Sequence, residues 1–251
     1  MMKKLTPLYI LMMLLAQNLM AVDIYATFNV KANKEATLAF TAGGTVAQNF
    51  VDVGSLVKKG QILARLENSE QKMVLALAKQ DLANAEVEAL KNINSFNRYA
   101  KIKDILDEEK YEQITFAKNV SQNSALKARY NVRLRQSQLD KTFIKAPFDG
   151  VITDRDKEVG DAVTGMQVMP YFQIMDISSV KLILEFDERY WSSVKVGQTF
   201  IYTVDGSDEK IEGLISKVYP SVNEKNRKVK AEVITKNLKP GLFGQGFIKV
   251  N

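Results

Sequence analysis

The sequence predicts a mixed β and α protein: a β-sandwich made of two halves, an antiparallel α-helical hairpin inserted between them, and a small β-barrel after them. Three observations support this fold class. The run from about Glu70 to Leu139 contains neither Gly nor Pro. A pattern of glycines and valines occurs once before this run and once after it. From Val180 onward, short segments of alternating apolar and polar residues are separated by turn sequences.

The first 21 residues have the features of a secretory signal peptide. Met1-Met2-Lys3-Lys4 precedes an apolar run from Leu8 to Leu15, and Leu19-Met20-Ala21 is an acceptable cleavage site. The apolar run is too short to predict a membrane span, but Gln17 and Asn18 obscure its end and leave an uncleaved anchor as the alternative. Both interpretations place the body of the protein outside the cytoplasm.

Two short β units flank the helical run. Each copy reads Gly, nine residues, Gly, two residues, Val, and a further Gly within two or three residues. Such a repeat predicts quasi-equivalent units, which are too small to bury a core alone and therefore pair into one sandwich. We expect the glycines, and Pro147 between them, to lie in turns, where the glycines supply φ > 0. The repeat residues are Gly44, Gly54, Val57 and Gly60, then Gly150, Gly160, Val163 and Gly165.

The run between the units is rich in Ala, Lys and Gln and is predicted to be helical. Its apolar residues recur at heptad spacing in a narrow stripe with charged flanks, which suits two helices packed on each other better than a helix on a globular core. The stripe is interrupted from Lys103 to Glu109, so we place the hairpin tip there, with arms of about 35 residues and roughly 50 Å. The seam residues are Leu75, Ala78, Leu82, Ala85, Ala89, Phe96 and Tyr99, then Ala125, Val132 and Leu139.

The last third of the chain has the pattern of a small barrel. Five or six short strands are separated by turn signals such as Asp205-Gly206 and Lys239-Pro240-Gly241. Tyr190-Trp191 begins a short helical segment, and we expect Trp191 to be a core anchor of the barrel. The expected organisation is a signal peptide (1–21), an N-terminal strand segment (22–37), the first half (38–68), the hairpin (69–141), the second half (142–176) and the barrel (177–251).

Composition restricts the chemistry. The 251 residues are 46% hydrophobic and 25% charged, and they include neither Cys nor His. This inventory excludes disulfides, thiolate metal sites and His-based acid–base catalysis, so we expect a protein that is not an enzyme. The net charge of +6 is spread along the chain without a block of like charge, which argues against nucleic-acid binding.

The segment from Thr142 to Ile152, followed by Val159-Gly160, resembles the signature of periplasmic adaptor subunits of bacterial tripartite efflux pumps, the HlyD-like membrane fusion proteins. The segment from Val51 to Leu66 is similar to the other lipoyl half-motif of that family. Each half alone also occurs in biotinyl and lipoyl carriers, whereas two halves split by a long hairpin are specific to the adaptors. The resemblance covers nearly everything after the signal and implies a split lipoyl-like β-sandwich with an inserted coiled-coil hairpin and a β-barrel.

The resemblance also implies partners. An adaptor joins an inner-membrane efflux transporter to an outer-membrane channel for export of drugs, toxic compounds or metal ions, and it assembles with itself into a ring, with a hexamer expected. It is periplasmic, associated with the inner membrane, and holds no cofactor. A resistance-nodulation-division transporter is favoured over an ATP-driven exporter on frequency within the family. A reduced adaptor is expected, because only a short segment precedes the first half.

The expected hairpin tip resembles the channel-docking motif of the family, an Arg, a Leu and a Ser around the turn. Arg98 matches the Arg, Ile102 stands in place of the Leu, and Asp107 lies near the Ser position. Arg98 can donate forked hydrogen bonds to a partner helix, and Ile102 can fill a hole in a helical seam. The alternative is that Arg98 is only an exposed charge and Asp107 only the N-cap of the return helix.

Two other segments contain candidate binding residues. Asp140-Lys141, nine residues before Gly150, resembles the acceptor of lipoyl carriers, but a carrier lysine needs an exposed β-turn, and Lys141 is expected at the end of a helix. The cluster of Met166, Met169 and Met175 could hold Cu(I) through thioether sulfur. Methionines more often fill gaps in a core, and we expect no resident metal.

Overall fold

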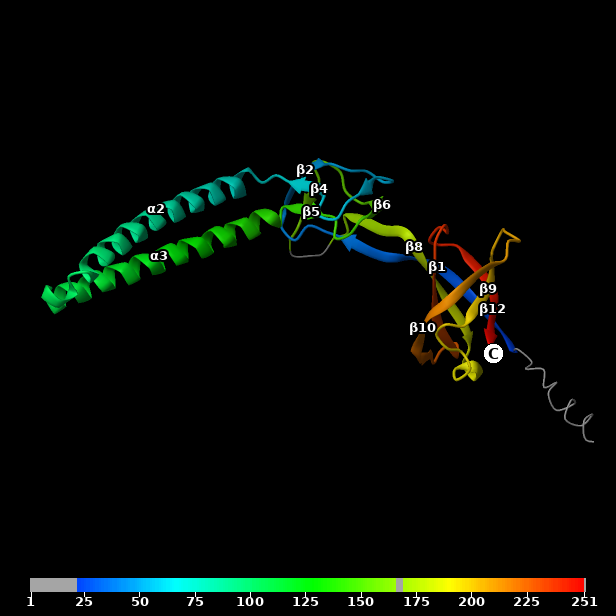
Figure 1. Cartoon of the computed structure of the whole chain (residues 1–251). Helices are drawn as coiled ribbons and strands as arrows, with labels where there is room; N and C mark the ends of the chain where they lie inside the picture. Colours follow the sequence, from blue (N-terminus) through cyan, green and yellow to red (C-terminus); the bar gives the residue numbers. More distant parts are fainter. Residues whose placement is uncertain (1–21, 166–168, 251) are drawn as a thin grey trace, which may run out of the picture. The chain divides into compact units, whose positions relative to one another are not determined.

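The computed structural model describes residues 22–165 and 169–250 (Figure 1). The expected signal peptide and Met166 lie outside the described residues. The chain divides into two compact units, one formed by residues up to Glu35 with those from Met175 onward, the other by Ala36–Ile174. The predicted mixture of β and α structure is confirmed. Within the described residues, no helix is long and apolar enough to cross a membrane.

The unit from Ala36 to Ile174 contains the two β repeats. One sheet has the order β5-β4-β2-β7, and β3 pairs with β6, which pairs on its other side with β8 (Phe172–Asp187). The strand bounds are β2 (Gly44–Asn49), β3 (Leu56–Val57), β4 (Ile62–Leu66), β5 (Phe143–Lys145), β6 (Gly150–Arg155) and β7 (Ala162–Val163). Gly44 of the first copy pairs with Val163 of the second, and Gly150 of the second pairs with Val57 of the first. The two pairs join equivalent positions of the repeat, so each copy pairs with the other in the same way. This is expected for a repeat whose halves cannot fold alone.

The turn glycines are partly as predicted. Gly54, Gly60 and Gly160 have φ of 87°, 83° and 94°, which side chains rarely adopt. Gly150 is a correction, because it is the first residue of β6 and pairs with Val57 instead of lying in a turn. Gly44 likewise opens β2, with φ of 158°, close to extended backbone. Pro147 lies in the bend between β5 and β6.

The core of the sandwich is drawn from both copies. Leu63, Leu66, Ile144 and Ile152 are buried in it, and the ring of Tyr171 packs edge-on against Phe40 and Phe172 with centroids 5.1 and 4.8 Å away. The remaining buried members are Val46, Val57, Ala64, Ala146, Val163 and Ile174. Burial raises the pKa of the Tyr171 hydroxyl, which donates to Oδ1 of Asn49 over 2.6 Å and so keeps a partner inside the fold.

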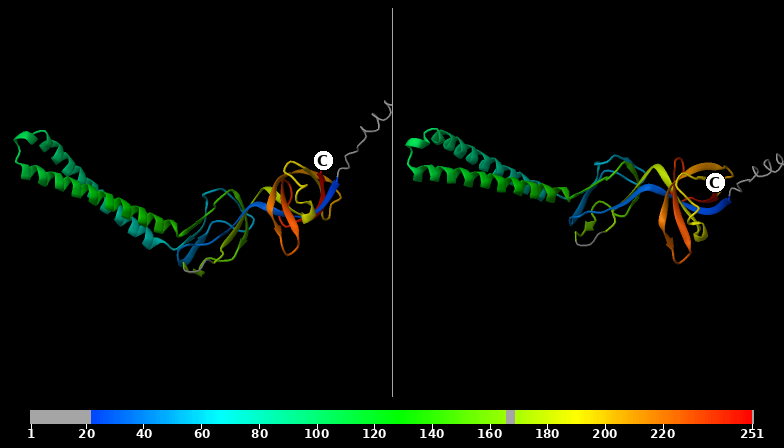
Figure 2. Two further views of the ribbon diagram at one scale, coloured as in Figure 1. Left: turned by 90° about the horizontal axis from the view of Figure 1, so that it is seen from below. Right: turned by 60° about the horizontal axis from the view of Figure 1, so that its bottom comes forward.

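The hairpin consists of α2 (Ser69–Ala100) and α3 (Glu108–Asp140), which lie side by side in Figures 1 and 2. At ~1.5 Å per residue, each helix is about 48 Å long. The predicted seam is confirmed, since every predicted seam residue is buried or half-buried. Most of its buried side chains are small, namely Ala78, Ala89, Ser121 and Ala125. Arg129 of α3 forms an ion pair with Glu86 of α2 over 2.8 Å.

In the other unit, six strands follow one another in the order β1-β12-β9-β10-β11-β8, and β8 pairs with β1 again. Their bounds are β1 (Val22–Leu38), β8 (Phe172–Asp187), β9 (Thr199–Val204), β10 (Ile211–Asn223), β11 (Lys228–Thr235) and β12 (Phe243–Val250). Alternate residues of these strands point into a common core, where Phe28 packs edge-on against Phe200 and Tyr202 at 5.9 and 5.2 Å. Gly244 and Gly246 leave room for these rings, because a Cβ at either position would collide with Phe28 or Phe200.

Trp191 is a second correction. It follows the 3₁₀ turn η2 (Glu188–Tyr190), and its side chain is 68% exposed instead of anchoring the core. The core positions of this loop belong to its neighbours, since Val194 is buried and Tyr190 packs against the core of the same unit. A tight turn that directs Tyr190 and Val194 inward leaves Trp191 on its outer side.

Candidate docking surfaces of the helical hairpin

The hairpin tip is built from the end of α2, the 3₁₀ turn η1 (Lys103–Ile105) and the start of α3. Consecutive short-range backbone bonds order it, from the N–H of Ile102 to the carbonyl of Tyr99 and from the N–H of Leu106 to the carbonyl of Lys103. Asp107 occupies the N-cap position of α3, as predicted, but its side chain makes no capping hydrogen bond. Its carboxylate is therefore free to accept a donor from outside the hairpin.

The predicted docking residues are all present on this tip. Arg98 lies exposed in the last turn of α2 and makes no ion pair or side-chain hydrogen bond within residues 22–165 and 169–250. Ile102 is also exposed. The sequence prediction missed Ile105, whose side chain is 85% exposed at the centre of the turn. Its signal was the apolar pair Ile105-Leu106 between charged residues of the turn.

Aromatic contacts brace the hairpin just behind the tip. Phe96 of α2 and Tyr111 of α3 lie with ring centroids 5.8 Å apart. Lys118 Nζ lies 3.9 Å from the centre of the Phe96 ring, and Lys103 Nζ lies 5.2 Å from that of Tyr111. These cation–π contacts join α2, α3 and the turn between them, and so stabilise the position of the tip at the end of the two helices.

A groove of about 560 Å³ runs beside the tip along α3. Lys103, Leu106, Tyr111 and Phe116 contribute to its lining, and the ring of Phe116 is largely exposed. The groove offers apolar contact beside the charged side chains of Lys103, Glu108 and Glu112. This combination of an apolar floor and charged neighbours suits a protein surface.

The outer faces of both helices also carry large apolar side chains, which the expectation of charged flanks missed. On α3 they recur at helical spacing, and α2 has a shorter counterpart. Single exposed apolar residues are ordinary, but a stripe along one helix face marks an interaction surface. We call these residues the outer stripe: Phe116, Val120, Leu126, Tyr130 and Leu134 on α3, and Met73, Leu77, Val87 and Leu90 on α2.

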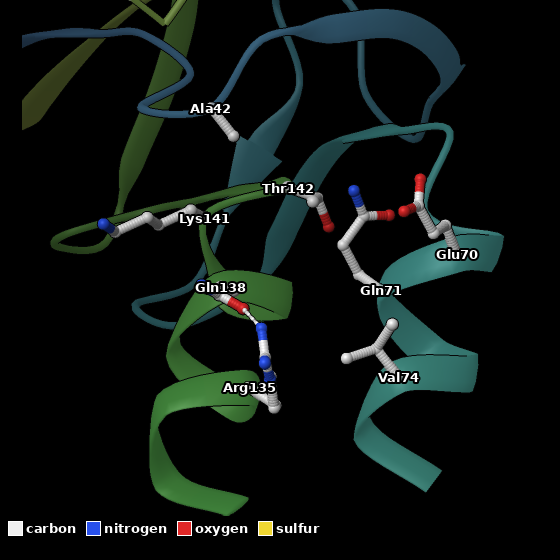
Figure 3. A pocket seen from close by; sticks show the side chains of 8 residues that line it. All are labelled: Ala42, Glu70, Gln71, Val74, Arg135, Gln138, Lys141 and Thr142. Atoms are coloured by element: carbon white, nitrogen blue, oxygen red, sulfur yellow. Dashed lines mark hydrogen bonds between the residues drawn. The ribbon is translucent and has the colours of Figure 1, made fainter. Parts of the chain in front are cut away.

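At its base, the hairpin encloses a pocket of about 300 Å³ between the first turn of α2 and the last turn of α3 (Figure 3). Gln71 and Val74 face it from α2, and Arg135 faces it from α3. Lys141 is the C-cap of α3, in right-handed helical backbone, and extends away from Gln71. This placement in a helix end, instead of a β-turn, disfavours the carrier interpretation.

The first turn of α2 is held by Glu67. Its Oε1 accepts hydrogen bonds from the N–H groups of Asn68 and Ser69 at 3.1 and 3.0 Å and from the Ser69 hydroxyl at 2.5 Å. The bond from the Ser69 hydroxyl, and then the backbone bonds, hold the pKa of the Glu67 carboxyl below its usual value. The charge also complements the positive end of the helix dipole.

No group of three or more His, Cys, Asp or Glu residues converges within the described part of the chain. Of the candidate methionines, Met169 precedes β8 and Met175 lies within it, and the two belong to different compact units.

The fold of this chain is similar to that of solved bacterial proteins. The structure of MacA from Actinobacillus actinomycetemcomitans aligns with 92% of this chain and 79% of that one at 20% identity, with a TM-score of 0.74. The membrane fusion protein Spr0693 from Streptococcus pneumoniae R6 aligns with 91% of this chain and 99% of that one at 20% identity, with a TM-score of 0.71.

Residues 34–176, more than half of the chain, match the family described as CzcB-like, barrel-sandwich hybrid domain, and the chain belongs to this family. The cobalt-zinc-cadmium resistance protein CzcB of Cupriavidus metallidurans is 27% identical over 225 residues. The match covers 84% of this chain and 42% of CzcB, so the chain spans less than half the length of that relative.

Proposed function

We propose that this protein is a non-enzymatic periplasmic adaptor, associated with the inner membrane, that links an inner-membrane efflux transporter to an outer-membrane channel. The observation that carries the proposal is the unpaired hairpin tip. Arg98, Ile102 and Ile105 are presented to solvent at the end of a long helical projection, and the carboxylate of Asp107 lacks a capping bond. A braced, exposed tip is suited to inserting between helices of a partner.

The proposed cargo is toxic metal ions, with drugs and other toxic compounds as the wider class. The name of the relative CzcB carries cobalt, zinc and cadmium resistance, and CzcB matches most of this chain. The metals pass as cargo, and no resident metal is needed in the adaptor. We favour a resistance-nodulation-division transporter as the partner over an ATP-driven exporter.

Self-association is the third part of the proposal. Both outer faces of the hairpin carry exposed apolar residues, for example Leu77 on α2 and Tyr130 on α3. Burying these stripes between neighbouring hairpins supplies hydrophobic stabilisation, roughly 25 cal/mol for each Å² of apolar surface removed from water. A ring of side-by-side copies, which we propose to be a hexamer, leaves every tip pointing to the same partner.

The domain organisation completes the proposal. Residues 1–21 act as the export signal, 22–37 as the leading strand, 38–68 and 142–176 as the two lipoyl-like halves, 69–141 as the docking hairpin and 177–251 as the β-barrel domain. The two copies interlock through the pairs Gly44–Val163 and Val57–Gly150, which supports treating them as one domain with an insertion.

The test uses a cysteine placed at Asp107, which is unambiguous because the chain contains none. Asp107→Cys protein, expressed in cells and treated with a short crosslinker, should be captured with an outer-membrane channel identified by mass spectrometry. The matched control is Lys225→Cys, an exposed position in the turn between β10 and β11. If the Asp107 probe captures only other copies of the chain, the tip is a self-contact and the docking role is wrong.

A further inference from the structure

The single tryptophan of the chain is displayed on a rigid loop. Several bonds lock this loop: Oδ1 of Asp187 accepts the N–H of Arg189 over 3.0 Å, and Nε2 of Gln198 donates to the carbonyl of Ser193 over 2.9 Å. The N–H of Lys195 donates to Oε1 of Gln198 over 2.8 Å. The backbone that carries the exposed indole of Trp191 is thus fixed, so burial of this side chain in a partner costs little loop ordering.

The outer face of the same unit contains a cleft of about 510 Å³. One row of paired residues crosses it over four strands, from Tyr25 on β1 through Phe247 on β12 and Ile201 on β9 to Glu212 on β10. The Tyr25 and Phe247 rings meet edge-on with centroids 5.8 Å apart, and the Tyr25 hydroxyl donates to Oε1 of Gln245 over 2.8 Å. About half of each ring remains exposed, so the cleft has an aromatic wall without a cover.

The charges around the two features are complementary. Glu188 and Lys195 lie on either side of Trp191 in the loop, and Lys210 and Glu212 line the cleft. None of these four side chains forms an ion pair within residues 22–165 and 169–250. The indole of Trp191 therefore has one acidic and one basic neighbour in its loop, and the cleft has one basic and one acidic residue in its lining. Each charge of the loop could pair with an opposite charge of the cleft.

We propose that Trp191 of one copy inserts into the Tyr25–Phe247 cleft of a second copy, with Lys195 near Glu212 and Glu188 near Lys210. The two surfaces differ, so the contact is heterologous, and repetition of such a contact closes a ring or extends a chain of copies. The inference rests on the self-association in the proposed function and assigns it a specific contact in the barrel unit. A tryptophan buried in a pocket is a typical energetic centre of an interface.

The test mixes two differently tagged chains, one carrying Trp191→Cys and the other Tyr25→Cys, in the same cells. Oxidation or a short crosslinker should join the two tags, whereas Trp191→Cys should link poorly with itself because the contact is heterologous. Ile234→Cys, an exposed apolar position on β11, replaces Trp191→Cys in the control and should link to Tyr25→Cys at background yield. Equal yields from the Trp191 and Ile234 probes, or preferred self-linking of Trp191→Cys, overturn the proposal.

A charge exchange provides the second measurement. Lys195→Glu should lower the yield of the specific crosslink at least several-fold, and adding Glu212→Lys should restore it. Failure of the second change to restore the yield contradicts the assigned pairing. A parallel chain with Tyr130→Cys reports hairpin self-association independently. If Tyr130 links between copies while the Trp191 and Tyr25 probes do not, the barrel contact is wrong and the proposed adaptor ring stands.

Discussion

Asn68, immediately before α2, donates from Nδ2 to Oγ1 of Thr142, just after α3, over 3.0 Å. Both side chains are almost fully buried, at 1% and 2% exposure, although they are polar. The Thr142 hydroxyl donates in turn to the carbonyl of Leu139 over 2.7 Å, and the Thr142 carbonyl accepts the N–H of Leu66 over 2.9 Å. This short chain of bonds ties the two ends of the hairpin to each other and to β4.

The first prediction concerns this connection. Thr142→Val keeps the shape of the side chain but leaves Nδ2 of Asn68 buried without its acceptor, so it should lower the free energy of unfolding by about 1–3 kcal/mol. Thermal or urea unfolding measures the change. Adding Asn68→Leu removes the other partner, and the double variant should lose less than the sum of the two single losses. Additive losses would show that the two residues do not stabilise the fold through each other.

The repeat makes a second prediction. Gly54→Ala and Gly160→Ala should each destabilise the sandwich by roughly 1–2 kcal/mol, because both glycines have φ near +90°, while the added methyl group meets no neighbouring atom. The cost is one of backbone conformation alone and should be similar at the two positions. Val159→Ala, an exposed neighbour, is the control and should leave the melting temperature nearly unchanged. Unaltered melting of Gly160→Ala, with native circular dichroism, would contradict the role of this turn.

The third prediction tests whether the hairpin is an insertion. Replacing residues 69–140 by a short Gly-containing linker should leave a folded β protein, since β4 and β5 already pair through Arg65 and Phe143 at the junction. Circular dichroism should show loss of helix and a retained cooperative transition, and the shortened protein should no longer capture the channel. An unfolded product would mean that the helices belong to the core of the sandwich.

The fourth prediction concerns recognition at the tip. Arg98→Asp should weaken binding to the channel by about 2 kcal/mol or more, because a donor is lost and a like charge is introduced near partner acceptors. Ile105→Asp should act in the same direction. Tolerance to cobalt, zinc or cadmium measures the loss, and melting should barely change because both positions are exposed. Lys225→Asp makes the same charge change in the other compact unit, so equal sensitivity of this control would argue against a specific tip.

The fifth prediction is a pH dependence at Glu67. Its pKa is lowered in the folded protein, so its stabilising contribution is present above the ordinary Glu value of 4.5 and is lost as the pH falls through the lower folded value. Glu67→Gln should therefore melt at a lower temperature than the natural protein at neutral pH, and the difference should shrink below pH 4.5. Glu70→Gln is the control, because it removes the same charge from the same turn without these hydrogen bonds. A difference that grows on acidification would contradict the assignment.

The candidate site was only partly predictable. Arg98, Ile102 and Asp107 were predicted from their resemblance to a docking motif around the turn. The structure places all three on the tip, and their role in docking stays a prediction. Ile105 was missed because the motif has no residue at that position, although its exposure exceeds that of Ile102. The outer stripe was missed because heptad spacing predicts only the seam between the two helices. Whether apolar residues on the opposite faces are exposed or covered is known only from the structure.

The sequence by itself determined the elements whose causes are local. A run without Gly or Pro forms the two helices, its heptad spacing selects the seam, and the repeated glycines mark turns such as those at Gly54 and Gly160. The tertiary structure decided which copy completes which: Gly150 became a strand residue because Val57 of the other copy pairs with it. It also left Trp191 in solvent, because Tyr190 and Val194 occupy the core positions of that loop, and it buried Asn68 with Thr142, 74 residues away. Burial and pairing depend on contacts between distant segments, and such contacts form only when the whole chain packs.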